Sequence, residues 1–312
     1  MLNLFQSIFS GTGKAERYPK SLVDEAIERA VDATDPWLRG LFGYRKKLRP
    51  AVVAAIDHVV SLVDDLSPPR TASRDSYGHD QLLQAMFLSS EQMRRILLGQ
   101  LTTQRIEDGA VYALLIAELE LRRISGVGLV GETLVRDVAQ VTASFANHRL
   151  IDPTAEETET RRLLKRRAFD HLLSLALRRM VAVKEIRKGL DDRQALLHAK
   201  LDTLQSGNWG FDAETSAQPV TIANLEAQLA EIEEQLLRVG RDDQSLEVAL
   251  GLLVDVLSQP ERHLWQNREP LVVDRMGITR NGPRDDAAEL QLETLHNAEG
   301  RSVVMTLVRV EL

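Results

Sequence analysis

The most regular feature of the sequence is a repeating pattern of apolar residues between about positions 160 and 257. In the first half of this stretch the spacing alternates between four and three residues, and only Arg187 and Gln194 interrupt the series. Its apolar members are Phe169, Leu173, Ala176, Met180, Val183, Leu190, Leu197, Leu201 and Leu204. This spacing is typical of a coiled-coil helix.

A second series keeps the same spacing and is interrupted only at Asp243. Its members are Ile222, Leu225, Leu229, Ile232, Leu236, Val239, Leu246, Leu250, Leu253 and Leu257. The residues between the two series include two glycines and Pro219, which end one helix before another starts. We therefore predict an antiparallel coiled-coil hairpin over residues 155–262, with arms of about 36 residues and about 54 Å each. The same apolar stripe also fits helices of a globular bundle.

The first 120 residues show helical periodicity as well. Apolar residues recur at helical spacing in 19–66, 80–98 and 107–121, with a break at Asp35 and Pro36. The polar stretch 67–77 contains prolines and predicts a surface loop. We therefore predict a helical domain over residues 1–120.

Strand-like patterns follow on both sides of the predicted hairpin. Val141, Ala143 and Phe145 alternate with polar residues, which favours a half-buried strand, although a helix also fits residues 134–145. Near the C-terminus, 270–278, 289–295 and 302–312 are strand-like, and residues 297–300 predict a hairpin turn. We predict that 121–152 and 265–312 form two halves of one small, mainly antiparallel sheet with the helical hairpin inserted between them. The predicted class is α+β, mainly α.

A glycine motif in residues 126–131 reads Gly-x-Gly-x-x-Gly, and Asp152 follows at the distance of a ribose-binding acid in a dinucleotide fold. Arg122 and Arg123 stand where that fold needs a buried strand, and coiled-coil helices follow where it needs alternating strands and helices. We therefore favour a glycine-bearing hairpin and expect no cofactor.

Composition narrows the function classes. The chain has 312 residues and no cysteine, which excludes disulfides, thiolate catalysis and Cys-ligated metals. A net charge of −7 argues against a protein that coats nucleic acid over its whole surface. No apolar run is long enough to span a bilayer, and the N-terminus lacks the pattern of a signal peptide. We expect a cytoplasmic protein.

Two basic clusters are candidates for binding an acidic partner. They consist of Arg161, Arg162, Lys165, Arg166 and Arg167 on the predicted helix after the sheet, and of Arg45, Lys46 and Lys47 in the N-terminal region. No aromatic residues are interleaved with the first cluster, so we do not expect it to bind nucleic acid. The second cluster, together with Asp64 and Asp65, resembles the basic turn and aspartate motif of isoprenyl diphosphate synthases. That resemblance covers only these residues and lacks the third aspartate of Asp-Asp-x-x-Asp.

Two further groups of residues are candidates for binding. His148, Arg149 and Asp152 form a candidate pocket, although they would equally well cap a strand and the following helix. Leu4, Phe5, Ile8 and Phe9 lie at helical spacing and form a candidate anchor for a membrane or a partner groove. The sequence assigns no catalytic residue, and its histidines lack the spacing of a metal site.

These patterns favour a cytoplasmic interaction or scaffold protein that binds a protein partner, or a second copy of itself, through the coiled-coil arms. The first alternative is an enzyme or ligand-binding protein with a site between the helical domain and the sheet. The second alternative is a protein that contacts a membrane through its N-terminus. The sequence leaves enzymatic activity open, and we favour its absence.

Overall fold

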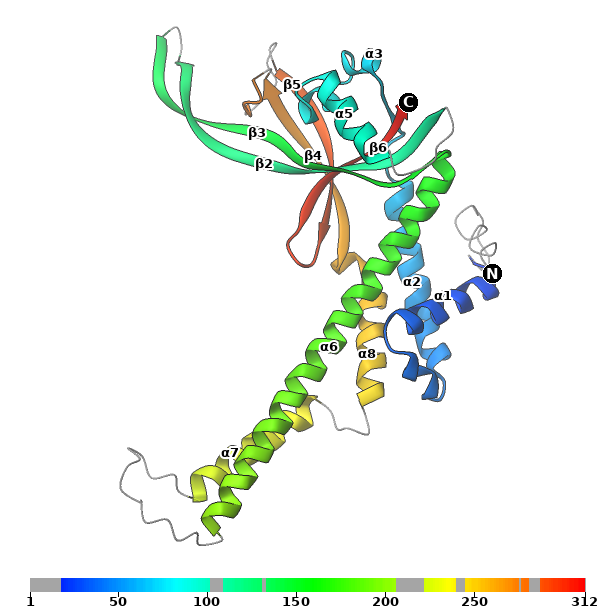
Figure 1. Ribbon diagram of the computed structural model, residues 1–312, viewed down its shortest axis with the longest axis vertical. Helices are drawn as coiled ribbons and strands as arrows, with labels where there is room; N and C mark the ends of the chain where they lie inside the picture. Colours follow the sequence, from blue (N-terminus) through cyan, green and yellow to red (C-terminus); the bar gives the residue numbers. More distant parts are fainter. Residues whose placement is uncertain are drawn as a thin grey trace. The chain divides into compact units, whose positions relative to one another are not determined.

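The computed structural model describes residues 18–101, 109–130, 133–205, 222–239, 245–274, 276–280 and 287–311. The fold is mixed α+β with one mainly antiparallel sheet (Figure 1), which confirms the predicted α+β class. The α-helices are α1 (Lys20–Ala33), α2 (Tyr44–Asp64), α3 (Arg74–Tyr77), α4 (Gln81–Met86), α5 (Ser90–Leu101), α6 (Glu157–Gln205), α7 (Ile222–Val239) and α8 (Ser245–Ser258). The 3-10 helices are η2 (Pro36–Gly40) and η4 (Pro260–Arg262). The strands are β1 (Arg70–Ala72), β2 (Ala110–Val130), β3 (Thr133–Thr154), β4 (Leu264–Asp274), β5 (Ala287–Asn297) and β6 (Ser302–Glu311).

The sheet joins strands from both sides of α6, α7 and α8 in the chain. Its order is β3-β2-β6-β5-β4, and the short β1 pairs with β6 in parallel. The predicted C-terminal meander is confirmed, because β4, β5 and β6 pair as antiparallel neighbours. Gly300, with a φ of 77°, lies in the predicted turn between β5 and β6. β1 lies in the stretch that the sequence predicts as a loop.

The helix predicted over residues 107–121 is wrong, because β2 begins at Ala110. Over residues 110–117, β2 pairs with β3 on one edge and β6 on the other, and residues of both faces are buried there. Val111 and Leu115 pack in the core beneath α4 and α5, whereas Leu114 packs with Leu164 in a second cluster. A strand buried on both faces has a continuous apolar run, which cannot be distinguished from a buried helix by periodicity.

Residues 126–130 of the glycine motif lie at the end of β2, which pairs with β3 as the predicted hairpin, and β3 is a strand over residues 134–146. Beyond Ala117, β2 no longer pairs with β6, and β2 and β3 continue together as a two-stranded ribbon (Figure 1). A Cβ atom at Gly126 would lie 2.2 Å from Oε1 of the buried Gln140 side chain. Gly126 therefore makes room for this amide, and the next element is a strand rather than the helix of a dinucleotide site.

The chain forms two compact units. The sheet unit contains residues 54–170 and 259–312, and the helical unit contains residues 20–53 and 171–258. Two of the boundaries lie inside α2 and α6, so each of these helices contributes to both units, and another follows the end of α8. Each unit has its own buried side chains, among them Leu115 in the sheet unit and Leu253 in the helical unit.

Within the helical unit, α6 and α7 share a hydrophobic cluster. Its buried members are Leu197, Leu225, Leu229 and Ile232, with Leu190, Leu201 and Leu236 packed against them. All seven residues belong to the apolar series that the sequence predicts. Nearer the sheet unit in sequence, α6 buries Leu172, Leu173 and Ala176, and Arg179 pairs with Asp255 of α8 at 3.0 Å.

Candidate functional site

The basic cluster at the start of α6 is engaged with the C-terminal end of α2. The guanidinium of Arg161 donates to the backbone oxygens of Val63 at 2.7 Å and Leu66 at 3.3 Å, and it pairs with Glu157. The last carbonyls of a helix lack intrahelical partners and carry partial negative charge. Arg161 therefore caps α2 and fixes the turn that leads to β1.

The other cations of this cluster are also paired within the protein. Lys165 is 3% exposed, and its Nζ lies 2.7 Å from Asp64. Arg167 makes a bidentate contact with Asp152 at 2.7 and 2.6 Å. Arg162 pairs with Glu159, and this hydrogen bond lowers the pKa of the Glu159 carboxyl. Arg166 has an interaction within the protein as well. The charges that made the cluster a candidate partner site are largely balanced internally.

The second basic cluster lies at the first turn of α2. Arg45 pairs with Glu28 of α1 at 2.8 Å and lies over the ring of Tyr44. Lys46 and Lys47 are exposed. These two lysines thus remain at the surface, where a negatively charged partner can reach them.

The structure does not bring His148, Arg149 and Asp152 together in one pocket. The imidazole of His148 stacks on Phe87 with centroids 4.5 Å apart and donates from Nε2 to the Met86 oxygen at 2.8 Å. Burial lowers the pKa of this imidazole, against a smaller opposing effect of the hydrogen bond to Met86. Arg149 is exposed, and Asp152 is held by Arg167. His148 therefore attaches the end of α4 to β3.

A polar cluster that the sequence did not indicate surrounds Glu293 in β5. This carboxylate is buried and accepts hydrogen bonds from the amide and hydroxyl of Ser67 at 3.2 and 2.6 Å. Arg268 lies 3.0 Å from it and also donates to the Asp65 oxygen. The partners of Glu293 are far from it in sequence, so no local pattern marks the cluster. Its contacts hold the end of α2 against the sheet.

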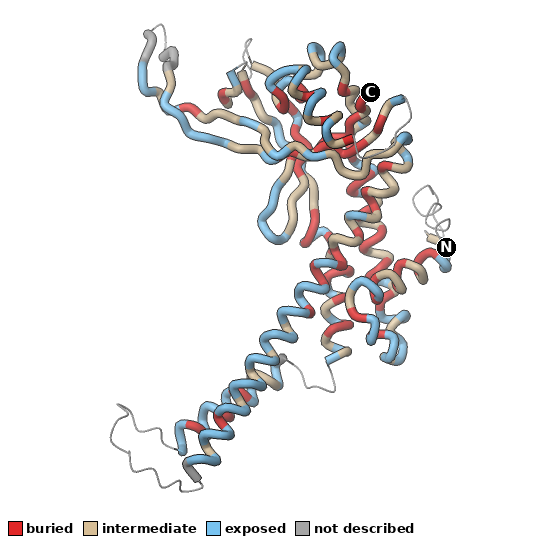
Figure 2. Tube along the Cα trace, in the orientation of Figure 1, coloured by how far each residue is buried: buried red, intermediate tan, exposed pale blue. Residues whose placement is uncertain are grey.

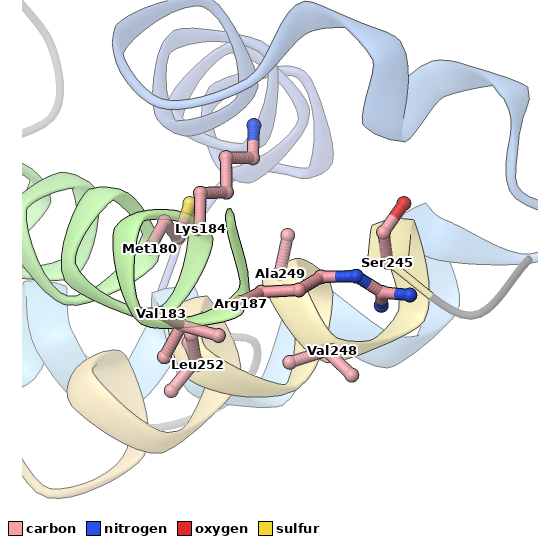
Figure 3. A pocket seen from close by; sticks show the side chains of 8 residues that line it. All are labelled: Met180, Val183, Lys184, Arg187, Ser245, Val248, Ala249 and Leu252. Atoms are coloured by element: carbon pink, nitrogen blue, oxygen red, sulfur yellow. The ribbon is translucent and has the colours of Figure 1, made fainter. Parts of the chain in front are cut away.

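A small depression lies between α6 and α8 in the helical unit (Figure 3). Four residues of each helix line it: Met180, Val183, Lys184 and Arg187 from α6, and Ser245, Val248, Ala249 and Leu252 from α8. Five of these eight side chains are apolar, and the two cations are accompanied by no carboxylate or imidazole in the lining. This lining supplies no acid and base pair for catalysis.

In the part of the chain that the structure describes, no three histidine or carboxylate side chains converge as metal ligands. Among the described helices, none has both the length and the apolar character needed to cross a bilayer. The candidate anchor formed by Leu4, Phe5, Ile8 and Phe9 lies outside the described residues.

The last turns of α6 and the whole of α7 carry apolar residues both inside and outside the shared cluster. Outside the cluster, Leu196 is 55% exposed and Leu237 is 61% exposed, although each is adjacent in sequence to a leucine of the cluster. Figure 2 shows this part of the helix pair as mainly exposed, with buried positions confined to the seam. The exposed leucines form a candidate contact surface.

No protein-family model, curated protein or solved structure matches this chain.

Proposed function

We propose that this chain is an interaction or scaffold protein that presents α6 and α7 as an antiparallel coiled-coil arm to a protein partner. The shared cluster supports this proposal, because its leucines and isoleucine follow the spacing of three and four residues that lets two helices pack along one seam. α6, α7 and α8 stand between β3 and β4 in the chain, so we interpret them as an insertion into the sheet. The absence of cysteine fits a cytoplasmic location.

The observation that carries the proposal is the exposure of large apolar side chains outside the seam. Leu196, Leu237 and Ile186 are each more than half exposed. The seam already supplies the contact between α6 and α7, so these residues add nothing to that contact. Ile186 and Leu196 lie on α6 and Leu237 lies on α7, so both helices of the pair expose large apolar side chains that a partner would cover.

The charge of α7 indicates the kind of partner. α7 carries Glu226, Glu231, Glu233 and Glu234 and one basic residue, Arg238. Arg238 pairs with Glu234 at 2.5 Å, which leaves α7 acidic overall. A helical partner with an apolar stripe and basic flanking residues would complement this surface.

Adjacent leucines provide a matched pair of variants. Leu196→Ser with Leu237→Ser removes exposed side chains, so we expect an unchanged melting temperature and at least a tenfold loss of partner recovered by quantitative affinity capture. Leu197→Ala opens the seam at a residue that is 5% exposed, so we expect it to destabilise α7 by about 2–5 kcal/mol.

Self-association is measured on the same variants by light scattering over a range of concentrations. If the partner is a second copy, the double variant shifts the mass toward the monomer. Recovery of the same partners in the same amounts, together with an unchanged mass, would refute the proposed role of the arm.

A further inference from the structure

A segment with two exposed aromatic residues, residues 36–50, contains η2 and the first seven residues of α2. Trp37 is 77% exposed and Phe42 is fully exposed. Single exposed apolar side chains are common on protein surfaces. Here two aromatic rings lie five residues apart, and each forgoes the burial of about 150–250 Å² that makes such residues dominate cores and interfaces. The segment therefore has the character of a contact surface.

The backbone that carries Trp37 is held in place from several sides. The Asp35 carboxylate accepts from the Trp37 amide at 3.1 Å and pairs with Lys184 of α6 at 3.1 Å. Leu38 is fully buried, and the Leu41 amide donates to its carbonyl at 3.1 Å. Trp37 is thus exposed on an ordered turn, so little conformational entropy is lost when it binds.

Phe42 is held by the next turn. Gly43 has a φ of 76°, a left-handed conformation that glycine adopts without strain. The Lys47 amide donates to the Gly43 carbonyl at 3.1 Å, which connects this turn to the start of α2. Phe42 and the lysines of α2 therefore belong to one continuous hydrogen-bonded segment.

The segment is basic throughout. It contains Arg39, Arg45, Lys46, Lys47 and Arg49 and no acidic residue. The three arginines pair with carboxylates of α1, namely Glu28, Asp32 and Asp24. Lys46 and Lys47 are exposed. The segment thus combines two exposed rings with two exposed lysines.

We propose that residues 36–50 bind the surface of an anionic lipid bilayer. Tryptophan and phenylalanine partition into the interface of a membrane, and exposed lysines are attracted to anionic headgroups. A bilayer offers both complements at once, negative charge at the surface and apolar chains beneath it. This surface is separate from the arm leucines and adds a membrane contact to the proposed function.

Vesicle sedimentation of the full chain tests the proposal. Vesicles of phosphatidylcholine with and without phosphatidylserine are compared, and we expect binding to the anionic vesicles that falls as salt rises. Trp37→Ala with Phe42→Ala is expected to weaken binding at least tenfold. Lys46→Ala and Lys47→Ala are expected to weaken it about fivefold each. In a Trp209→Phe, Trp265→Phe background, Trp37 fluorescence shifts to the blue on binding.

Control variants locate the contact. Leu88→Ser removes an almost fully exposed leucine from the sheet unit and is expected to leave vesicle binding unchanged. Phe5→Ser with Phe9→Ser tests the predicted N-terminal anchor, and circular dichroism verifies that every variant is folded.

Three results would overturn the proposal. The first is that the wild type does not bind anionic vesicles. The second is that Trp37→Ala with Phe42→Ala binds the anionic vesicles as well as the wild type does. If only Phe5→Ser with Phe9→Ser then loses binding, the N-terminus is the membrane contact. The third is that the aromatic variant changes the oligomeric mass without any vesicle binding, which would identify the segment as a contact between copies.

Discussion

At the scale of single residues, His148 is a buried titratable group with a structural role. Its stacking on Phe87 and its hydrogen bond to Met86 place the ring where burial lowers the pKa of the imidazole below its ordinary value of 6.5. The unfolded chain therefore binds a proton at His148 more readily than the folded chain does. The free energy of unfolding rises with pH where the unfolded state binds more protons. His148 therefore costs no stability above pH 6.5, and it lowers the free energy of unfolding as the pH falls through 6.5.

We predict that the free energy of unfolding falls as the pH drops from 7.5 through 6.5 toward 5.5, and that His148→Asn reduces this fall. Urea titrations of both proteins at several pH values measure the difference. Protonation of carboxyl groups whose pKa is lowered, such as Glu159 and Asp274, reduces stability only below this pH range. Both proteins contain these groups. If the free energy of unfolding depends on pH in the same way in the two proteins, His148 is not the group responsible for the fall.

At the scale of elements, the β2 and β3 hairpin is shaped by bulges in β3. The register shifts three times, and an Asp or Asn with positive φ lies at each shift: Asp137, Asn147 and Asp152. Each bulge puts one extra residue into β3, which bends the strand and increases its twist. Asp and Asn tolerate the left-handed conformation better than other residues with a side chain.

We predict that Asn147→Val destabilises the fold by about 2 kcal/mol. A β-branched residue at a φ of 54° is strained, and the 2.7 Å hydrogen bond to Glu118 is lost. Asn147→Gly loses only the hydrogen bond and is expected to cost about 1 kcal/mol or less. Ser144→Val is the control, because this exposed residue of β3 has a negative φ and valine favours strands. Equal effects of valine at the two positions would show that the bulge is not strained.

The same elements show how far the sequence predicts the fold. Polar and apolar residues alternate in β5, and a recognisable turn joins β5 to β6, so local patterns locate both strands. In β2, Val111 and Leu114 face different clusters, and this two-sided burial hides the period of two. β1 is three residues long, and its backbone is a strand because it pairs with β6. Such elements depend on tertiary contacts that no local window contains.

The candidate sites were predictable to a similar degree. The sequence marks Arg161 and Lys165 as basic, but their partners at the end of α2 are about a hundred residues away. Charge alone could not distinguish an internal cap from a docking site. The exposure of Trp37 and Phe42 was equally hidden, because apolar residues near a helix break are usually expected to be buried.

At the scale of the whole molecule, α2 and α6 belong to both units. The backbone hydrogen bonds of a helix run without interruption along its length, and breaking a helix leaves up to four donors and four acceptors without intrahelical partners at the new ends. The chain passes between the units inside α2, after Val53, and inside α6, after Asp170. Unfolding one unit alone would therefore require two helices to break.

We predict that the two units unfold as one cooperative system. Leu253→Ala removes a fully buried side chain of the helical unit and is expected to cost about 2–5 kcal/mol. In a Trp37→Phe, Trp209→Phe background, the remaining Trp265 reports on the sheet unit, where it stacks on His296. Ellipticity at about 222 nm reports on the helices, and coincident transitions from two probes indicate two-state unfolding.

Leu253→Ala should lower the midpoints of the fluorescence and ellipticity transitions together, because the shared helices transmit the loss to the sheet. Leu115→Ala in β2 provides the reciprocal variant and should also move both midpoints. If Leu253→Ala lowers only the ellipticity midpoint, α2 and α6 break at the unit boundary. The sheet unit would then fold independently of the helical unit, which contains the arm and residues 36–50.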